Sequence, residues 1–472
     1  MNTTYTRTSS APGTSPGRLV RLLALLFVLG LVAAACGGDD DTSSPDEDGT
    51  DQDGNDGAPS TLRVPDDYDT IQAAVDAAAP GSLVLVAPGT YNEAVDVTTD
   101  QLVIRGLDRN EVILDGEFEL ENGIRVLEAD GVVVENMTLR NYTRNGVFWT
   151  HVDGYRGSYL TAERNGDYGI YAFGSVNGVL EHSYGAGSPD AGFYIGQCYP
   201  CNAVIDDVIA EYNGLGYSGT NAGGDLYIIN SEWRRNRAGI VPNSGSYEGC
   251  APERETSVVG NLVYENSNGD TPAISAARLA QGNGIITPGG VDNVIERNRI
   301  WDHDVSGIAI VPFPEEDPIA PIPETPPTGC TEDAAPASDD VREGLGGELI
   351  WPATGNRVVG NDISDSREWD LVMILGSGNC FSDNVLTTQS PEGLQDLAPC
   401  DGSDAEDIAT DVARFLEIVD QDRPDSADYA TYEFPSIGDL PGMDDPENAP
   451  AEPQVGPPAF PDLAAIGLPD RP

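Results

Sequence analysis

Apolar and turn-forming residues alternate along most of the chain in short blocks that recur at a nearly constant interval. A glycine followed by apolar residues appears at Gly123, Gly146, Gly169, Gly192, Gly216, Gly239, Gly284 and Gly307. The successive intervals are 23, 23, 23, 24, 23, 45 and 23 residues, and the long one contains the segment SGSYEGCAPERET. A period held this closely predicts a solenoid, in which each repeat packs only on its neighbours.

A second apolar block lies between these glycines, and it reads VVEN at Val133, VLEH at Val179, VIDD at Val204, and VVGN at Val258 and Val358. Each repeat therefore holds β-branched runs separated by glycine, asparagine and aspartate, which tolerate positive φ. Residues 83–310 show no sustained helical period. Repeats of about 23 residues with three strands predict a coil of parallel strands, each paired one coil along, about 4.8 Å away. The leucine spacing of leucine-rich repeats and a six-residue period are both absent.

One short helix is predicted at the start of this region. In IQAAVDAAAPG, the apolar residues Ile71, Ala74, Val75 and Ala78 share one helical face, and Pro80-Gly81 ends the helix. The following SLVLV and the Pro88-Gly89 turn begin the sheet. An open end of a stack leaves backbone groups unpaired and core exposed, so we expect this helix to cover the first coil.

The stretch YDTIQAAVDAAAPGSLVLVAPGTYNEAVDV, followed by Gly/Asn coils, resembles the right-handed parallel β-helix family of the pectate-lyase-like superfamily. The resemblance covers about residues 62–388 and implies an all-β, right-handed parallel β-helix with a short N-terminal capping helix. The family includes lyases, hydrolases, epimerases, adhesins and accessory proteins, so the resemblance says little about activity. Its polysaccharide lyases use lysine or arginine as base with carboxylate-held calcium, but no catalytic motif of the family is present to carry over.

The ends of the chain have different compositions. Arg18 and Arg21 precede an apolar run that ends in Ala-Ala-Ala-Cys36, which resembles a bacterial lipobox. Cys36 is therefore the predicted lipidation site of an exported protein anchored to the membrane by lipid, on its extracytoplasmic side. The predicted organisation is a lipoprotein signal peptide at 1–35, an acidic disordered linker at 36–60, the β-helix at 61–388 with insertions near 241–257 and 311–355, and a C-terminal region at 389–472 with a capping helix and a Pro/Asp-rich tail.

Charge narrows the possible partners. Acidic residues outnumber basic ones 79 to 24, the net charge is −55, and every basic residue is arginine. Such a charge repels nucleic acid and opposes a polyuronate substrate. Calcium is the one cofactor that the sequence suggests, because carboxylates that can bind it are abundant. No spaced calcium-loop motif occurs.

Six cysteines follow Cys36, and export into an oxidising compartment makes them disulfide candidates. They are Cys198, Cys201, Cys250, Cys330, Cys380 and Cys400. Six cysteines allow 15 pairings. The CYPC motif lacks the helix of redox motifs and the second pair of a zinc site, so Cys198–Cys201 is expected to be structural. Cys250–Cys330 would join the two insertions, and Cys380–Cys400 would tie the last coils to the C-terminal region.

Two sets of residues are candidates for function. Counting back from the repeat glycines gives a column with Asn141, Arg164, Glu211, Arg234 and Asp302, followed by Tyr142, Asn165, Tyr212, Arg235 and His303. Equivalent solenoid positions project from one wall, so Arg164, Glu211, Tyr212 and Arg234 are candidate sugar-binding residues. A solvated turn is the competing interpretation of the same column.

The WDHD segment is the densest titratable cluster. Asp302, His303 and Asp304, with Arg235, are the candidate catalytic residues, because a histidine between two aspartates suits a general base or a metal site. Neighbours alternate sides in an extended chain, so the three need not converge. No metal site is assigned, because three histidines and four methionines offer few ligands for copper. We expect a protein that binds or processes extracellular carbohydrate, with a non-catalytic structural or adhesion module as the alternative.

Overall fold

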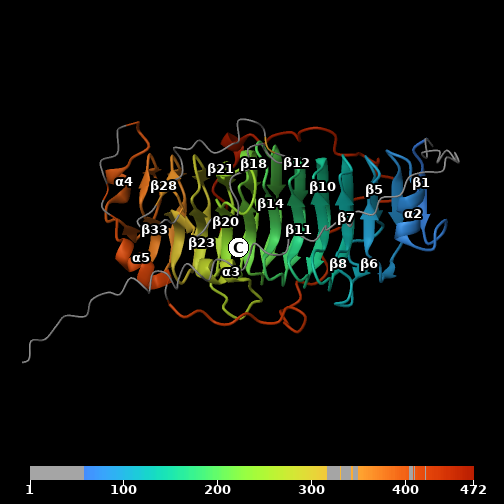
Figure 1. The fold of residues 1–472 in the computed structure, drawn as a ribbon, viewed down its shortest axis with the longest axis horizontal. Helices are drawn as coiled ribbons and strands as arrows, with labels where there is room; N and C mark the ends of the chain where they lie inside the picture. Colours follow the sequence, from blue (N-terminus) through green and yellow to red (C-terminus); the bar gives the residue numbers. More distant parts are fainter. Residues whose placement is uncertain are drawn as a thin grey trace, which may run out of the picture.

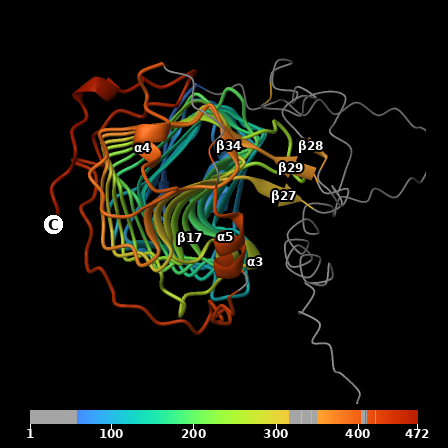
Figure 2. The same ribbon diagram turned by 90° about the vertical axis from the view of Figure 1, so that its left-hand side faces the viewer.

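The computed structural model describes residues 58–315, 330, 342–343, 349–402, 408, 410–419 and 421–472. The strands stack along one long axis into a right-handed parallel β-helix (Figure 1). Seen along that axis, successive coils superimpose as one closed outline (Figure 2). The fold predicted from the 23-residue period is confirmed.

Three walls of parallel strands enclose the core. The first wall contains β1 (Thr61–Val64), β2 (Leu83–Val86), β5 (Val103–Gly106), β8 (Val132–Arg140), β10 (Asp153–Glu163), β12 (Val176–Glu181), β15 (Ala203–Asp206), β18 (Gly223–Ile229), β21 (Arg254–Val259), β24 (Val294–Glu296), β31 (Arg357–Val359) and β35 (Cys380–Ser382). The second contains β3 (Gly89–Tyr91), β6 (Val112–Asp115), the ends of β8 and β10, β13 (Tyr184–Ala186), β16 (Ile209–Glu211), β19 (Glu232–Arg234), β22 (Leu262–Tyr264), β25 (Arg299–Trp301) and β32 (Asp362–Ser364).

The third wall is the 11-stranded sheet. It contains β4 (Val95–Val97), β7 (Ile124–Leu127), β9 (Val147–Thr150), β11 (Tyr168–Phe173), β14 (Ala191–Gly196), β17 (Leu215–Thr220), β20 (Ala238–Asn243), β23 (Asn283–Pro288), β26 (Ser306–Val311), β33 (Trp369–Met373) and β36 (Gln389–Ser390). The repeat glycines begin these strands in register. Ile240 of β20 pairs with Ile285 of β23, so the 45-residue interval is a single long coil.

Inward-facing side chains alternate with outward-facing ones, as strand geometry requires. The inward residues form one continuous apolar core from Leu62 to Ala398, with Trp149 and Trp233 fully buried. Asparagines continue this stacking at the corners. Asn261 and Asn298 each donate their backbone N–H to the side-chain oxygen of the next asparagine along the stack, at 3.0 and 2.9 Å. The side chains of these asparagines accept hydrogen bonds from buried backbone N–H groups at the corners. They lie inside the solenoid, whereas the sequence analysis interpreted them as turn residues.

Helices cover both ends of the stack. Helix α2 (Ile71–Ala77) begins at Thr70, whose hydroxyl accepts from Ala73 N–H, and it buries Ile71, Ala74 and Val75 over the first coil as predicted. At the other end, α4 (Leu394–Leu397) buries Leu394, and Ala398 accepts a hydrogen bond from Phe381. The sequence analysis did not predict α4, because four residues are too few to show a helical period.

The C-terminal capping helix predicted within 389–472 is described as α5 (Val412–Val419), near the last coils, and another short helix, α3 (Ser275–Ala280), lies nearer the middle of the stack (Figure 1). Val412 and the α3 residues Ala277 and Ala280 pack on the outer side of the third wall. Helix α5 therefore covers part of a wall, whereas the prediction placed it over the open end. The partly buried Ile408 packs against the main core.

The insertions leave the stack between strands. Residues 244–253 connect β20 to β21, and a second excursion with α3 lies between β22 and β23. The insertion expected at 311–355 contributes β27 (Phe313–Glu315), β28 (Arg342–Glu343) and β29 (Leu349–Trp351), an antiparallel sheet, and then β30 (Ala353–Thr354), which pairs with β34 (Gly376–Ser377). The signal peptide, Cys36 and the linker up to residue 57 lie outside the described residues.

Candidate functional site

Aromatic side chains form an outward-facing row across three successive coils of the third wall. Phe148 of β9, Tyr171 of β11 and Tyr194 of β14 are register partners. Their strand neighbours point into the core, so the three rings point outward. The rings of Phe148 and Tyr171 are stacked, with centroids 4.7 Å apart and planes 13° apart. Tyr171 and Tyr194 meet edge to face at 4.7 Å.

Tyr168 widens this row. Its ring stacks on Tyr171 with centroids 4.3 Å apart and planes 7° apart, and it meets Tyr194 at 5.0 Å. Tyr168 and Tyr171 are partly buried, whereas Tyr194 is 1% exposed. Together these rings form an aromatic platform, defined here as Phe148, Tyr168, Tyr171 and Tyr194.

Two carboxyl groups border the platform. The Tyr194 hydroxyl donates to Glu248 Oε2 at 2.5 Å, which brings the 244–253 insertion onto β14. The Tyr168 hydroxyl donates to Asp190, which stands just before β14. A third carboxylate, Asp167, lies near Asp190 and is bound by Arg144 at 2.9 Å.

The two bordering carboxyl groups hold their protons unusually tightly. Burial raises the pKa of Asp190 to about 7, against the weaker opposing effect of the Tyr168 hydrogen bond. Burial likewise raises the pKa of Glu248 to about 8, again against the hydrogen bond from Tyr194. Each negative charge also disfavours the next, since Asp190 raises the pKa of Glu248 and Asp167 raises that of Asp190. A protonated acid beside a half-ionised one at neutral pH suits acid–base chemistry.

The column predicted from the sequence is only partly in register. Tyr212 and Arg235 share a corner position with Asn141, Arg164 and Asp302, and all five have φ between 50° and 62°. Glu211 and Arg234 stand one residue earlier, on the second wall, paired with each other in register and by an ion pair of 2.7 Å. Counting back from the glycines gave the wrong partners because one interval is 24 residues. Residues in successive coils are equivalent when they share the same corner, not when they lie at the same distance from the glycine.

The predicted column is also occupied by the chain itself. Phe434 of the C-terminal segment stacks on Tyr212, with centroids 5.3 Å apart and planes 19° apart. Arg164 lies over the ring of Phe118, 5.7 Å from its centroid. Glu211 is 2% exposed and is held by both Arg234 and Arg235. The structure therefore does not bring Arg164, Glu211, Tyr212 and Arg234 together as an open sugar-binding surface.

The WDHD cluster does not converge. His303 is 2% exposed and takes the inward corner place that asparagines take in earlier coils; Asn266 Nδ2 lies 3.4 Å from its Nε2. Burial lowers the pKa of His303 to about 3. Asp302 and Asp304 are exposed. His303 is thus a neutral ring in the core, and the hypothesis of a surface general base at 302–304 is not supported. Arg235 binds Glu265 at 2.9 Å.

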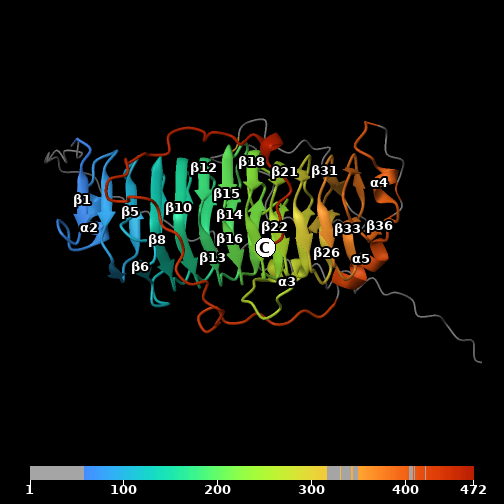
Figure 3. The same cartoon turned by 180° about the vertical axis from the view of Figure 1, so that it is seen from behind.

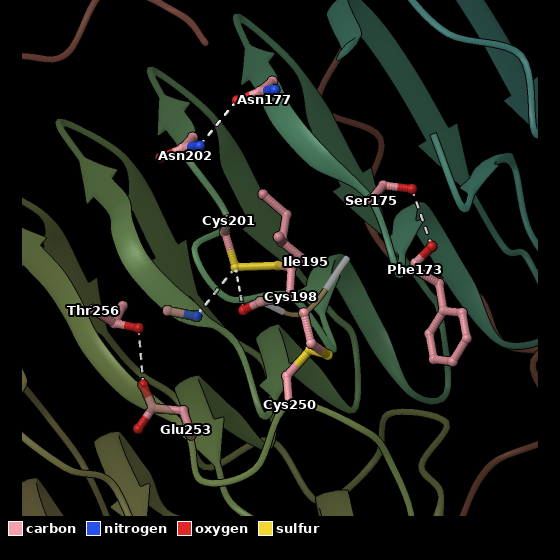
Figure 4. Close-up of a disulfide and its surroundings, with 12 residues drawn as sticks. Phe173, Ser175, Asn177, Ile195, Cys198, Cys201, Asn202, Cys250, Glu253 and Thr256 are labelled. Atoms are coloured by element: carbon pink, nitrogen blue, oxygen red, sulfur yellow. Dashed lines mark hydrogen bonds between the residues drawn. A yellow bond between two sulfur atoms is a disulfide. The ribbon is translucent and has the colours of Figure 1, made fainter. Parts of the chain in front are cut away.

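The cysteines pair as the sequence analysis expected. The disulfides are Cys198–Cys201, Cys250–Cys330 and Cys380–Cys400. Figure 4 shows Cys201 accepting a backbone N–H, with Cys250 close by. The Cys250–Cys330 bond fixes the 244–253 insertion, which carries Glu248, to the later excursion.

Within the described residues, no three histidine, cysteine, aspartate or glutamate side chains gather in a way that would hold a metal ion. In the same part of the chain, no helix has the length and apolar character needed to cross a membrane.

The sequence analysis missed the aromatic platform, although its signal was in the repeat itself. The segments that begin at the repeat glycines Gly146, Gly169 and Gly192 read GVFW, GIYA and GFYI, and each carries an aromatic residue at the third position. That position alternates with two core residues, so it must face outward. Glu248 and Asp190 had no comparable signal, because their approach to the rings depends on how the insertion and the corner fold.

Solved structures with a similar course of the backbone include the A-modules of the Azotobacter vinelandii mannuronan C-5 epimerases AlgE4 and AlgE6. The AlgE4 module has a TM-score of 0.45 and 16% identity, over 67% of this chain and 90% of that chain. The AlgE6 module has a TM-score of 0.46 and 16% identity, over 68% and 94%. An alginate lyase from Paenibacillus sp. str. FPU-7 gives 0.37 and 14%, over 53% and 90%. No family model and no curated protein matches. At these low identities the similarity concerns the course of the backbone alone.

Proposed function

We propose that this protein is an exported, lipid-anchored glycan-binding protein that cleaves glycosidic bonds at the aromatic platform. The observation that carries the proposal is the outward row of rings on successive coils, bordered by Glu248 and Asp190. The ring faces of Tyr171 are covered by Phe148 and Tyr168, so the outer edges of these partly exposed rings supply the apolar surface for sugar rings. A row with the strand spacing of a solenoid suits an extended polymer. Glycoside hydrolysis is usually catalysed by a pair of carboxyl groups, one on each side of the bond that is cleaved.

Each group has a role in this proposal. Glu248, protonated up to about pH 8, donates its proton to the glycosidic oxygen as the bond to the anomeric carbon breaks. Asp190, with a pKa of about 7, accepts a proton from the attacking water. Water supplies the hydroxyl group on the new reducing end, so no further reactant is needed. The Tyr194 hydroxyl holds the Glu248 carboxyl in position between turnovers.

The charges around the platform suggest the class of glycan. Asp190 is about half ionised at neutral pH, Asp167 lies close to it, and the nearby Arg144 is already bound to Asp167. A uronate carboxylate placed on the rings would lie close to these acidic groups. Arg144 would not offset its charge, because Arg144 already binds Asp167. We therefore propose a neutral or amino-sugar polysaccharide as the substrate.

Incubation with a polysaccharide panel tests the proposal. We expect new reducing ends from neutral or amino-sugar polymers, loss of that activity in Glu248→Gln, and full activity in Glu111→Gln, which removes an exposed carboxylate elsewhere. Equal activity in the two variants would remove Glu248 from the mechanism. A Cys36→Ala variant should leave the membrane fraction, and one that stays there would contradict the lipid anchor.

A non-catalytic adhesion module is the second candidate, and one observation favours it. Both carboxyl groups already have tyrosine partners, and Asp190 is only 6% exposed. In that case the platform binds a glycan without cleaving it. Retention on a polysaccharide gel without any new reducing ends would select this function.

A further inference from the structure

The C-terminal segment 421–472 runs along most of the stack and then part of the way back. Figures 1 and 3 show it leaving the α5 end, following one edge toward the first coils and returning along another side. Its only regular structure is a 3-10 turn at Leu463–Ala465. The sequence analysis expected a Pro/Asp-rich tail, and the structure gives this segment contacts with several coils.

Arginine side chains bind backbone carbonyl groups of the outward leg, the part of the segment that runs from α5 toward the first coils. The fully buried Arg237 donates to the carbonyl oxygens of Pro424 and Asp425 at 3.0 and 2.9 Å. Farther along, Arg109, which is 3% exposed, donates to Pro441 O at 2.9 Å.

Aromatic rings fix the same leg between those arginines. Phe434 stacks on Tyr212, and Tyr429 meets Phe118 edge to face at 6.0 Å. At Gly187, where φ is +76°, a Cβ atom would lie 2.7 Å from the Phe434 ring, so only glycine leaves room for the segment.

The turn and the return leg are held in the same way. Arg105 is 1% exposed and donates to the carbonyl oxygens of Pro446, Ala449 and Pro450, at 3.1, 2.7 and 2.8 Å. On the return leg, Arg297 donates to Leu463 O and Ile466 O, both at 2.8 Å.

Apolar contacts accompany the arginines on the return leg. Leu463 and Ile466 pack on a patch of the first wall formed by Val204, Ile229 and Val259. Near the turn, Ala451 packs on a second patch of outward apolar residues that includes Leu85 and Val133. These patches explain why apolar side chains point outward on a wall whose other face is the core.

We propose that these arginines and apolar patches form a peptide-binding track, whose ligand is an extended, proline-rich chain and whose resident occupant is the protein's own segment 421–472. Proline-rich peptide suits the track because it stays extended and presents free carbonyl groups. The segment is a separable ligand that ties distant coils together, from β5 to β25, whereas solenoid coils otherwise contact only their neighbours.

Cleavage of the intact protein tests this. A protease site is inserted after the exposed Gln421, the folded protein is cut, and retention of fragment 422–472 is followed by gel filtration. We expect the fragment to co-elute with the stack. A labelled synthetic 422–472 peptide should then exchange into the cut protein and remain bound to it.

Substitutions on the fragment leave the stack unchanged, so they separate loss of binding from misfolding. Ile466→Asp should speed release at least tenfold, because it places a charge on the Val204 patch. Leu468→Asp, at a side chain that is 39% exposed, is the matched control and should release like the wild type. Immediate release of the wild-type fragment, or equal release of the two variants, would overturn the proposal.

Discussion

The Tyr194 hydroxyl donates to Glu248 Oε2 at 2.5 Å and so joins the aromatic platform to an insertion more than fifty positions along the chain. The contact places an acid with a raised pKa against rings that three separate coils supply. The predictions below follow from this relationship and from the order of the core.

The stability of the protein should depend on pH through Glu248. Its pKa is 4.5 in an ordinary environment and about 8 when folded, so the folded state keeps a proton that the unfolded state loses. The free energy of unfolding should therefore fall as pH rises from about 4.5 to about 8, by up to about 1.4 kcal/mol per pH unit. Urea titrations at pH 5 to 8 should show a shallower slope for Glu248→Gln and an unchanged slope for Glu111→Gln. Parallel slopes for wild type and Glu248→Gln would contradict the raised pKa.

The ring of Tyr171, rather than its hydroxyl group, should bind the glycan. Tyr171→Ala should weaken retention on a polysaccharide affinity gel about three- to tenfold, and Tyr171→Phe should leave it nearly unchanged. Tyr264→Ala is the matched control, because Tyr264 stacks on Trp301 on the second wall, with centroids 4.2 Å apart. A loss in Tyr264→Ala without one in Tyr171→Ala would move the binding surface to the second wall.

His303 should act on acid stability and not on glycan binding. Its pKa falls from 6.5 to about 3 on burial, so between these pH values the unfolded state binds a proton and the folded state does not. Stability should be lost as pH falls from about 6.5 toward 3. His303→Asn, which restores the side chain found at this corner in earlier coils, should shift acid unfolding to lower pH, as followed by circular dichroism. His151→Asn serves as the control, and a shift equal to that of His303→Asn would refute the assignment.

The corner asparagines should each matter to stability. Asn298 accepts from Asn261 N–H and donates to Val258 O at 2.9 Å, so Asn298→Ala leaves buried groups unpaired. We expect a loss of about 1–3 kcal/mol in urea unfolding. Asn448→Ala, in the exposed tail, should change stability by less than about 0.5 kcal/mol. Equal effects would mean that the ladder is not a stabilising feature.

The sequence predicted much of the fold and little of the candidate site. The period predicted the coils, because each repeat packs on its neighbours through apolar residues at the same spacing. The apolar spacing in IQAAVDA predicted α2. The column was partly out of register, because Tyr212 and Arg235 sit at a corner whose distance from the glycine differs by one residue between coils. His303 looked like a surface base because the sequence shows its neighbours but not the inward turn of the corner.

The repeated glycines, the β-branched blocks and the excess of acid determined by themselves that this chain forms a solenoid with a large negative charge. Those are properties of local spacing and total charge. Only the tertiary structure decided that Glu248 meets Tyr194, that Phe434 covers Tyr212 and that Arg237 holds Pro424. These contacts join residues far apart in the chain, and no local pattern records them, because they arise where excursions fold back on the finished stack.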